Sequence, residues 1–320
     1  MATLTVLTPT YNRADYLQKL YDSLVKQTGK DFDWLIVDDG SMDNTEEVIQ
    51  GFIDAAAGLS ISVVKQCNGG KHRALNNGIS RISSELTFIV DSDDTLPENA
   101  IETILEYHKK YTSLYDVRTG ERISQNKLDK RSVSDNPDRI CGYSFLRCGE
   151  DGSVNTAYFP SDELIGTFKD VRINGGIGGD KAEVYFTAVL GQYPFPEFDG
   201  EKFLPEDAVW MRISRSYKMV HINKNVYTCE YHDNGLTKSG HAMKIHSPRG
   251  MMLRSEEYLC TPGVKLKVHI KMMMLYIIYA RFAGVSHKEL DSKIRDTLLF
   301  CLCYVPAQVV YYKWKSETGA

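Results

Sequence analysis

The sequence predicts an α/β fold in which helices cover both faces of a parallel sheet. Strand-like and helix-like segments alternate over the first hundred residues, which is typical of parallel strands joined by right-handed crossovers. A cluster of polar residues follows each strand-like segment, and ligands bind such sheets beyond the carboxyl ends of the strands. With 320 residues, 42% of them hydrophobic and 25% charged, the chain can bury a full core as one large domain or two that share an interface.

The expected elements follow one another closely over residues 1–110. Short apolar runs mark the strands, and apolar residues three or four positions apart mark the helices. Ser41 or Asp43 can cap the second helix, which ends near residue 52, and Pro97 suits the first turn of the fourth. We expect strands at 3–7, 34–37, 61–64 and 86–90, and the other helices at 14–27, 71–82 and 97–110.

The remaining chain carries weaker signals. Residues 116–140 are charged and poor in large apolar groups, which predicts an exposed insertion. The glycine-rich run at 174–179 either brings backbone close to a ligand or is a flexible connection. Beyond residue 240 we expect mainly helices, and neither apolar run there, 272–280 or 298–312, reaches the ~20 residues that cross a bilayer.

Composition favours a cytoplasmic protein. The seven cysteines are scattered and form no C-x-x-C pair, so we expect reduced thiols. Met1 leads directly into a strand-like run without the pattern of a signal peptide. The net charge of -4 hides an asymmetry, because residues 244–320 hold 12 Lys and Arg against 6 Asp and Glu. We expect no nucleic-acid partner.

The run Asp91-Ser92-Asp93-Asp94 after the fourth strand is the sharpest motif. Three carboxylates so close together repel one another unless a cation neutralises them. Oxygen ligands suit Mg²⁺ or Mn²⁺, which typically share phosphate oxygens with a substrate. The alternative is an acidic turn and helix cap before Pro97.

Polar groups at the other strand ends suit a nucleotide. Asp39 can accept hydrogen bonds from a base imide or a ribose hydroxyl, although a simple turn explains it when taken alone. The ring of Tyr11 can stack on the base. Lys71 follows two glycines at a helix start, where amides and the helix dipole also favour phosphate; a solvated lysine is the alternative.

Together these blocks resemble the family 2 glycosyltransferases of the GT-A fold. The blocks are Pro9 to Arg13, Val37 to Ser41, Gly70 to Asn76 and Asp91 to Asp94, and their order and spacing match over about 110 residues. The resemblance continues more loosely to Glu206-Asp207 and fades after about residue 240. It implies an inverting transfer, with Asp39 on uracil and the acidic run holding the metal on the diphosphate. The donor-binding residues are then Thr8, Pro9, Tyr11, Arg13, Asp39, Asn68, Gly70, Lys71, Asp91, Ser92 and Asp93, and the metal ligands are Asp93 and Asp94.

Two later motifs complete this resemblance. Asp207, the second member of an acidic pair that begins a helix, is the expected catalytic base, with Glu206 beside it. Helix-start acids favoured by the dipole are the alternative. The segment 232–239 resembles a loop that closes on the diphosphate, which makes Thr237 and Lys238 donor-binding residues and His232 a further metal ligand.

The sequence therefore predicts a nucleotide-sugar-binding half at 1–110, an acceptor-binding and catalytic-base half at 111–240, and a helical extension at 241–320. The expected reaction moves a hexose or N-acetylhexosamine from a UDP-sugar to a glycan or lipid-linked acceptor, with Mn²⁺ or Mg²⁺. The rivals are a nucleotidyltransferase and a non-catalytic sugar-nucleotide-binding subunit. We expect the extension to contact either the inner face of the cell membrane or a second copy of the chain.

Overall fold

The computed structural model describes residues 2–55, 58–123, 139–229, 240–286, 290 and 296–318. The chain divides into two compact units. Unit 1 comprises Met1–Pro194 and Ser216–Tyr231, and unit 2 comprises Phe195–Arg215 and His232–Ala320. This division differs from the one expected from the sequence, because residues 195–215 group with the C-terminal helices.

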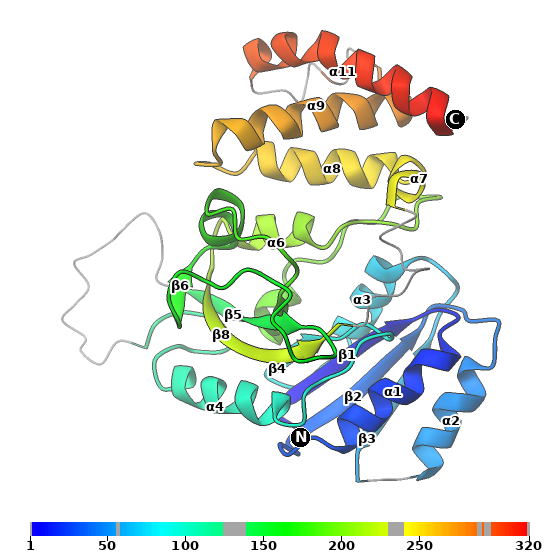
Figure 1. Ribbon diagram of the computed structural model, residues 1–320, viewed down its shortest axis with the longest axis vertical. Helices are drawn as coiled ribbons and strands as arrows, with labels where there is room; N and C mark the ends of the chain where they lie inside the picture. Colours follow the sequence, from blue (N-terminus) through cyan, green and yellow to red (C-terminus); the bar gives the residue numbers. More distant parts are fainter. Residues whose placement is uncertain are drawn as a thin grey trace. The chain divides into compact units, whose positions relative to one another are not determined.

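Unit 1 is built on one eight-stranded sheet with the order β3-β2-β1-β4-β7-β5-β8-β6 (Figure 1). The first four strands in this order are parallel, as expected for the N-terminal part. Beyond them β7 runs antiparallel to β4 and β5, β5 is parallel to β8, and β6 is antiparallel to β8. The strands are β1 (Leu4–Thr10), β2 (Phe32–Asp38), β3 (Ser60–Lys65), β4 (Leu86–Ile89), β5 (Ile140–Cys148), β6 (Leu164–Gly166), β7 (Ala182–Phe186) and β8 (Lys218–Thr228).

Helices cover both faces of the parallel strands. The ring of Trp34 lies against Tyr21 of α1 and Phe52 of α2. Gly78 of α3 comes close to Leu7 and Val37. Side chains alternate between faces along a strand, so Trp34 and Val37 of β2 point to opposite sides and α3 lies across the sheet from α1 and α2. The helices are α1 (Ala14–Val25), α2 (Thr45–Ala55), α3 (Lys71–Ile79), α4 (Ala100–Thr112) and α5 (Thr187–Leu190), with the π-helix η1 at Lys169–Asn174.

The fold class and the N-terminal elements expected from the sequence are confirmed. Boundaries shift by a few residues, because β1 continues to Thr10 and α4 begins at Ala100. Of the expected insertion, isolated bridges join Tyr115 to Arg122 and Glu121 to Arg139. Residues 124–138 lie outside the described residues.

Unit 2 is helical, with α8, α9 and α11 stacked side by side (Figure 1). Buried residues of α9 and α11 form one apolar cluster, and α8 and α9 contribute to a second. Over the described ranges, no helix is both long and apolar enough to cross a membrane. The helices are α6 (Asp207–Ile213), α7 (Gly240–Ile245), α8 (Pro248–Leu259), α9 (Leu266–Phe282) and α11 (Thr297–Thr318).

Candidate functional site

The carboxyl ends of β2, β1 and β4 meet at one edge of the sheet of unit 1. Thr10 is in register with Asp38, and the Asp39 amide donates to the Thr10 carbonyl at 2.8 Å. On the other side of β1, the Val90 amide donates to the Leu7 carbonyl at 3.0 Å. The polar residues that follow these three strands therefore belong to one site, as the sequence predicts, and we call it the strand-end site.

Backbone and side-chain hydrogen bonds tie the β1 and β2 ends together. Asn12 has a positive φ of 51°, and its amide donates to the Ser41 hydroxyl at 2.9 Å. The Asn12 side-chain oxygen accepts from the Met42 amide at 2.8 Å, and Asp38 accepts from the Ser41 amide at 2.9 Å. Beside this junction the Tyr11 side chain is 40% exposed, so its ring is accessible for stacking.

Asp39 is buried and holds the segment between β3 and α3. One carboxylate oxygen accepts from the Gln66 side chain at 2.7 Å and the Gly69 amide at 2.8 Å. The other accepts from the Gly70 amide at 2.7 Å and the Asn68 side chain at 3.2 Å. A carboxylate accepts about four hydrogen bonds, so a base imide would have to share an oxygen that a protein donor already uses.

The turn Asp91–Asp94 carries one cation on each of its first two carboxylates. Lys71 at the start of α3 lies 2.5 Å from an Asp91 oxygen. Arg13 lies 3.8 Å from an Asp93 oxygen, and the Asp93 side chain remains 27% exposed. The Asp91 and Asp93 side chains are similarly exposed, so Asp93 differs from Asp91 in its looser ion pair, whereas Asp94 is buried.

Two residues that the sequence analysis missed shape this turn. The hydroxyl of Tyr227, on β8, accepts from the Asp91 amide at 2.9 Å and donates to Asp94 at 2.8 Å. The Arg147 guanidinium lies 3.9 Å from the centroid of the Tyr227 ring, and one of its nitrogens is 4.0 Å from Asp94. Both come from the second half of the sheet, more than fifty residues along the chain, and no local pattern marks them.

These surroundings separate the pKa values of the aspartates. Burial alone would raise the pKa of Asp91, but the charges of Lys71 and Arg147 outweigh it and hold that pKa below its ordinary value. Burial, followed by the negative charge of Asp91, raises the pKa of Asp94 to about 6. The turn therefore carries carboxylates of unequal basicity within four residues.

The strand-end site fits a divalent cation that a diphosphate helps to hold. Among the described residues, no group of three or more His, Cys, Asp or Glu is arranged to hold a metal ion alone. The available donors are carboxylate oxygens, with Asp93 accessible at the surface. Mg²⁺ and Mn²⁺ are commonly bound by one or two carboxylates together with substrate phosphates.

Other predicted donor-binding residues have mixed placements. Thr8 is fully buried, and its hydroxyl accepts from the Trp34 ring at 3.0 Å, so its side chain belongs to the layer under α1 and α2. Pro9 and Ser92 are also buried. The remaining predicted residues lie outside the described residues: His232, Thr237 and Lys238.

Asp207 begins α6 of unit 2 and is held by α8. Its Oδ2 accepts from the Tyr258 hydroxyl at 2.8 Å and from the Arg254 guanidinium. Its Oδ1 accepts from Arg254 Nε at 2.7 Å, so Oδ1 has fewer hydrogen-bond partners than Oδ2 among the described residues. Glu206, the neighbouring acid, is the residue that precedes the helix.

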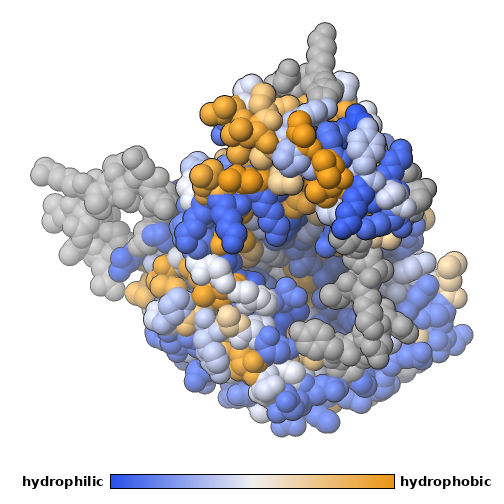
Figure 2. All heavy atoms as spheres, turned by 45° about the horizontal axis from the view of Figure 1, so that its top comes forward, coloured by the Kyte–Doolittle hydropathy of each residue, from blue (hydrophilic) through white to orange (hydrophobic). Residues whose placement is uncertain are grey.

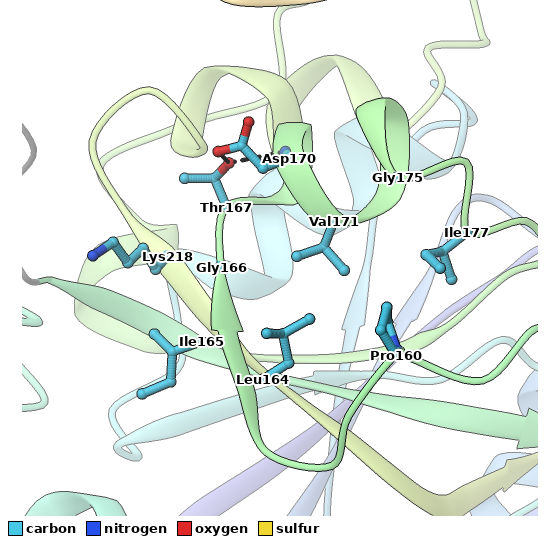
Figure 3. Close-up of a pocket in the computed structure, with 10 residues that line it drawn as sticks. All are labelled: Pro160, Leu164, Ile165, Gly166, Thr167, Asp170, Val171, Gly175, Ile177 and Lys218. Atoms are coloured by element: carbon cyan, nitrogen blue, oxygen red, sulfur yellow. Dashed lines mark hydrogen bonds between the residues drawn. The ribbon is translucent and has the colours of Figure 1, made fainter.

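A separate apolar pocket lies beside β6, the last strand in the sheet order. Its volume is about 380 Å³, and the glycine-rich loop forms one wall through Gly175 and Ile177 (Figure 3). Thr167 and Asp170 bond to each other at 2.7 Å on its rim. β7, β5 and β8 separate β6 from β4 in the sheet, so this pocket is not part of the strand-end site.

Comparison with known proteins agrees with this architecture. The family model for glycosyl transferase family 2 matches residues 5–155. The Streptococcus pneumoniae glycosyltransferase GlyA is 32% identical over 302 residues, which are 91% of this chain and 41% of GlyA. The chain thus spans about two fifths of the length of that relative.

Two solved structures share the fold at low sequence identity. S. aureus TarS 1-349, in complex with UDP-GlcNAc, has a TM-score of 0.59 at 18% identity over 98% of this chain and 81% of that chain. The mannosyltransferase PcManGT of Pyrobaculum calidifontis, in complex with GDP-Man and Mn2+, has a TM-score of 0.53 at 16% identity, with 99% and 83% covered.

Proposed function

The chain belongs to glycosyltransferase family 2, and from this premise we propose that it transfers a hexose or N-acetylhexosamine from a UDP-sugar to a hydroxyl of a glycan or lipid-linked acceptor. The reaction would serve surface polysaccharide or glycoconjugate synthesis in the cytoplasm, at the inner face of the membrane. The observation that carries the proposal is the strand-end site, where Asp93 remains accessible beside Arg13 and Lys71 pairs with the neighbouring Asp91. The UDP-GlcNAc complex of TarS supports the choice of donor.

In this proposal the strand ends bind the donor. The exposed ring of Tyr11 stacks on the base. Asp39 shapes the base site by holding Asn68 and Gly70, and it reaches a base imide by sharing an oxygen. Lys71 and Arg13 attract the diphosphate, and Thr237 and Lys238 add further donors. Asp91 and the backbone of Ser92 complete the contacts to the nucleotide.

A divalent ion, Mn²⁺ or Mg²⁺, would be held by Asp93 and Asp94 with His232, and when bound it would supply charge neutralisation for the departing diphosphate. The Mn2+ of PcManGT supports this assignment. Residues of the chain support these carboxylates, because the Tyr227 hydroxyl bonds to Asp94 and the Arg147 guanidinium lies over the Tyr227 ring.

Asp207 acts as the general base. Its Oδ1 takes the proton from the acceptor hydroxyl, while Arg254, which donates to both oxygens, and Tyr258, which donates to Oδ2, fix the orientation of the carboxylate. The acceptor oxygen then bonds to the anomeric carbon as the bond from that carbon to the β-phosphate oxygen breaks. UDP leaves with that electron pair, and a single displacement from the opposite side inverts the anomeric centre.

A donor panel tests the proposal. Purified protein with Mn²⁺ is given UDP-, GDP- and TDP-sugars, and released nucleoside diphosphate is measured with and without EDTA. We expect release from one UDP-sugar, lost with EDTA and in Asp93→Asn, but kept in the control Asp54→Asn, which removes an exposed charge from the far end of α2. Tight binding of a UDP-sugar without release, in the presence of varied acceptors, would indicate a non-catalytic subunit instead. Release of pyrophosphate in a separate reaction that supplies a nucleoside triphosphate and a sugar 1-phosphate would indicate nucleotidyl transfer.

A further inference from the structure

The C-terminal helix α11 exposes a continuous apolar stripe. One side of the helix packs on α9 through residues such as Phe300, Cys303 and Ala307. The opposite side carries large hydrophobic residues at alternating spacings of four and three, which places them in one line along the helix. They are Leu298, Leu302, Val305, Val309 and Tyr312, each 61–73% exposed. Between Thr297 and Tyr312 the helix has no charged residue.

The first turns of α9 extend this stripe. Leu266 is 69% and Ile270 is 39% exposed. The Cys303 thiol lies 3.9 Å from the Ile270 carbonyl, so these turns lie next to the part of α11 that carries Leu302. We call the two sets of residues together the apolar face. Figure 2 shows hydrophobic residues gathered over this part of unit 2.

Lysines and aromatic rings border the apolar face. Lys265, Lys267 and Lys271 are exposed beside Leu266 and Ile270. At the other end of the stripe, Lys313 and Lys315 are exposed next to Tyr312, whose ring is also exposed. At a membrane interface, lysines typically extend to lipid phosphates, and tyrosine or tryptophan rings lie at the level of the headgroups.

The charges distinguish a lipid surface from a second copy of the chain. Over the described residues 296–318, the acidic residues are Asp296 and Glu317. Asp296 caps α11 by accepting from the Leu299 amide at 2.9 Å, and Glu317 lies 3.9 Å from Lys313. Two copies packed stripe to stripe would bring lysines against lysines, whether the helices ran parallel or antiparallel. Like charges in contact oppose association, whereas anionic headgroups complement the same lysines.

The dimensions also suit a helix that lies on a bilayer. The stripe spans fifteen residues from Leu298 to Tyr312, and the fourteen steps between its ends make it roughly 21 Å long at 1.5 Å per residue. No described helix is suited to crossing a membrane. We propose that the apolar face rests in the surface of an anionic lipid bilayer, with Leu298, Leu302, Val305 and Val309 among the acyl chains and the bordering lysines on the headgroups.

Vesicle flotation tests this proposal with the whole chain. We expect binding to phosphatidylcholine vesicles that contain phosphatidylglycerol, weaker binding at high salt, and little binding to phosphatidylcholine alone. Leu302→Glu/Val309→Glu should lower partitioning at least tenfold. The matched control, Met42→Glu/Ile53→Glu, changes two exposed apolar residues of unit 1 and should bind as wild type does.

A second pair of variants tests the charges alone. Lys313→Gln/Lys315→Gln should lower binding to the anionic vesicles by about fivefold per lysine, which is ~1 kcal/mol converted at 1.4 kcal/mol per tenfold. All these positions are exposed, so circular dichroism and thermal unfolding should match wild type. The proposal is wrong if wild type ignores anionic vesicles, or if the Leu302 and Val309 variant binds them normally. Sedimentation as a dimer that this variant dissociates, without vesicle binding by wild type, would show that a second copy covers the face.

Discussion

Replacement of Tyr227 by phenylalanine tests whether the acidic turn is held from the far half of the sheet. The change removes only the hydroxyl, which accepts from the Asp91 amide at 2.9 Å and donates to Asp94 at 2.8 Å. The ring and its stacking on Arg147 at 3.9 Å remain. Tyr227 is fully buried, so water cannot easily replace the lost partner.

The magnitude follows from the groups left behind. A buried donor or acceptor that loses its partner costs about 1–3 kcal/mol, and this variant leaves one of each. Arg147, 4.0 Å from Asp94, partly compensates the carboxylate. We therefore expect the free energy of unfolding to fall by about 2–4 kcal/mol. We also expect the Mn²⁺-dependent part of UDP binding to weaken about tenfold or more, equivalent to at least ~1.4 kcal/mol.

Denaturant unfolding and calorimetric titration of UDP, with Mn²⁺ and with EDTA, measure both effects. Tyr143→Phe is the matched control, because Tyr143 is also buried and its hydroxyl bonds to His108 at 3.1 Å, away from the turn. This control should lose stability and keep metal-dependent binding. Wild-type stability and wild-type metal-dependent UDP affinity in Tyr227→Phe would refute the positioning role.

Three further predictions concern other residues. Asp207→Asn should lower the transfer rate by roughly 100-fold to 10,000-fold while UDP affinity changes less than about tenfold, and stability should fall somewhat because Arg254 loses its charged partner. Glu206→Gln should lower the rate less, and a larger loss in Glu206→Gln than in Asp207→Asn would exchange the roles of the two acids. Asp39→Asn replaces an acceptor by a donor facing Gly69, Gly70 and their neighbours, so UDP affinity should fall both with Mn²⁺ and with EDTA, unlike in Asp93→Asn. Burial lowers the pKa of His221 to about 4, and the bond of His221 to Gly166 opposes this shift only partly. The neutral His221 ring therefore stabilises the fold above about pH 6.5, and ~3 kcal/mol of the free energy of unfolding should be lost as the pH falls through about 4. Acid unfolding of His221→Gln that matches wild type would contradict this.

Much of the strand-end site could be predicted from local sequence. Apolar periodicity marks the strands and helices, and alternation of the two implies parallel strands whose carboxyl ends share one edge. The acidic run after β4 and the residues after β1 and β2 must then lie near one another. This inference needs only short-range patterns, and the register of Thr10 with Asp38 and the bond from the Val90 amide to the Leu7 carbonyl confirm it.

Local sequence could not assign the partners of these residues. Asp94 bonds to Tyr227 on β8, 133 residues away, and Asp207 bonds to Arg254 across 47 residues. Such pairs depend on the strand order beyond β4 and on how α6 packs against α8. Nothing in the neighbouring residues of either partner encodes that packing.

The C-terminal helix shows the same division. The sequence alone determined that residues 298–312 are apolar and too short to span a bilayer. Only the tertiary structure decided which side of α11 is covered. Residues on both sides of the helix are hydrophobic, so no polar side in the sequence marks which side faces solvent. Packing against α9 buries Phe300, Cys303 and Ala307 and leaves Leu302 and Val309 in solvent. In a helix that is apolar on all sides, the neighbouring elements decide which side is buried. The free energy of burial depends on the apolar area that they remove from water and not on the identity of the residues alone.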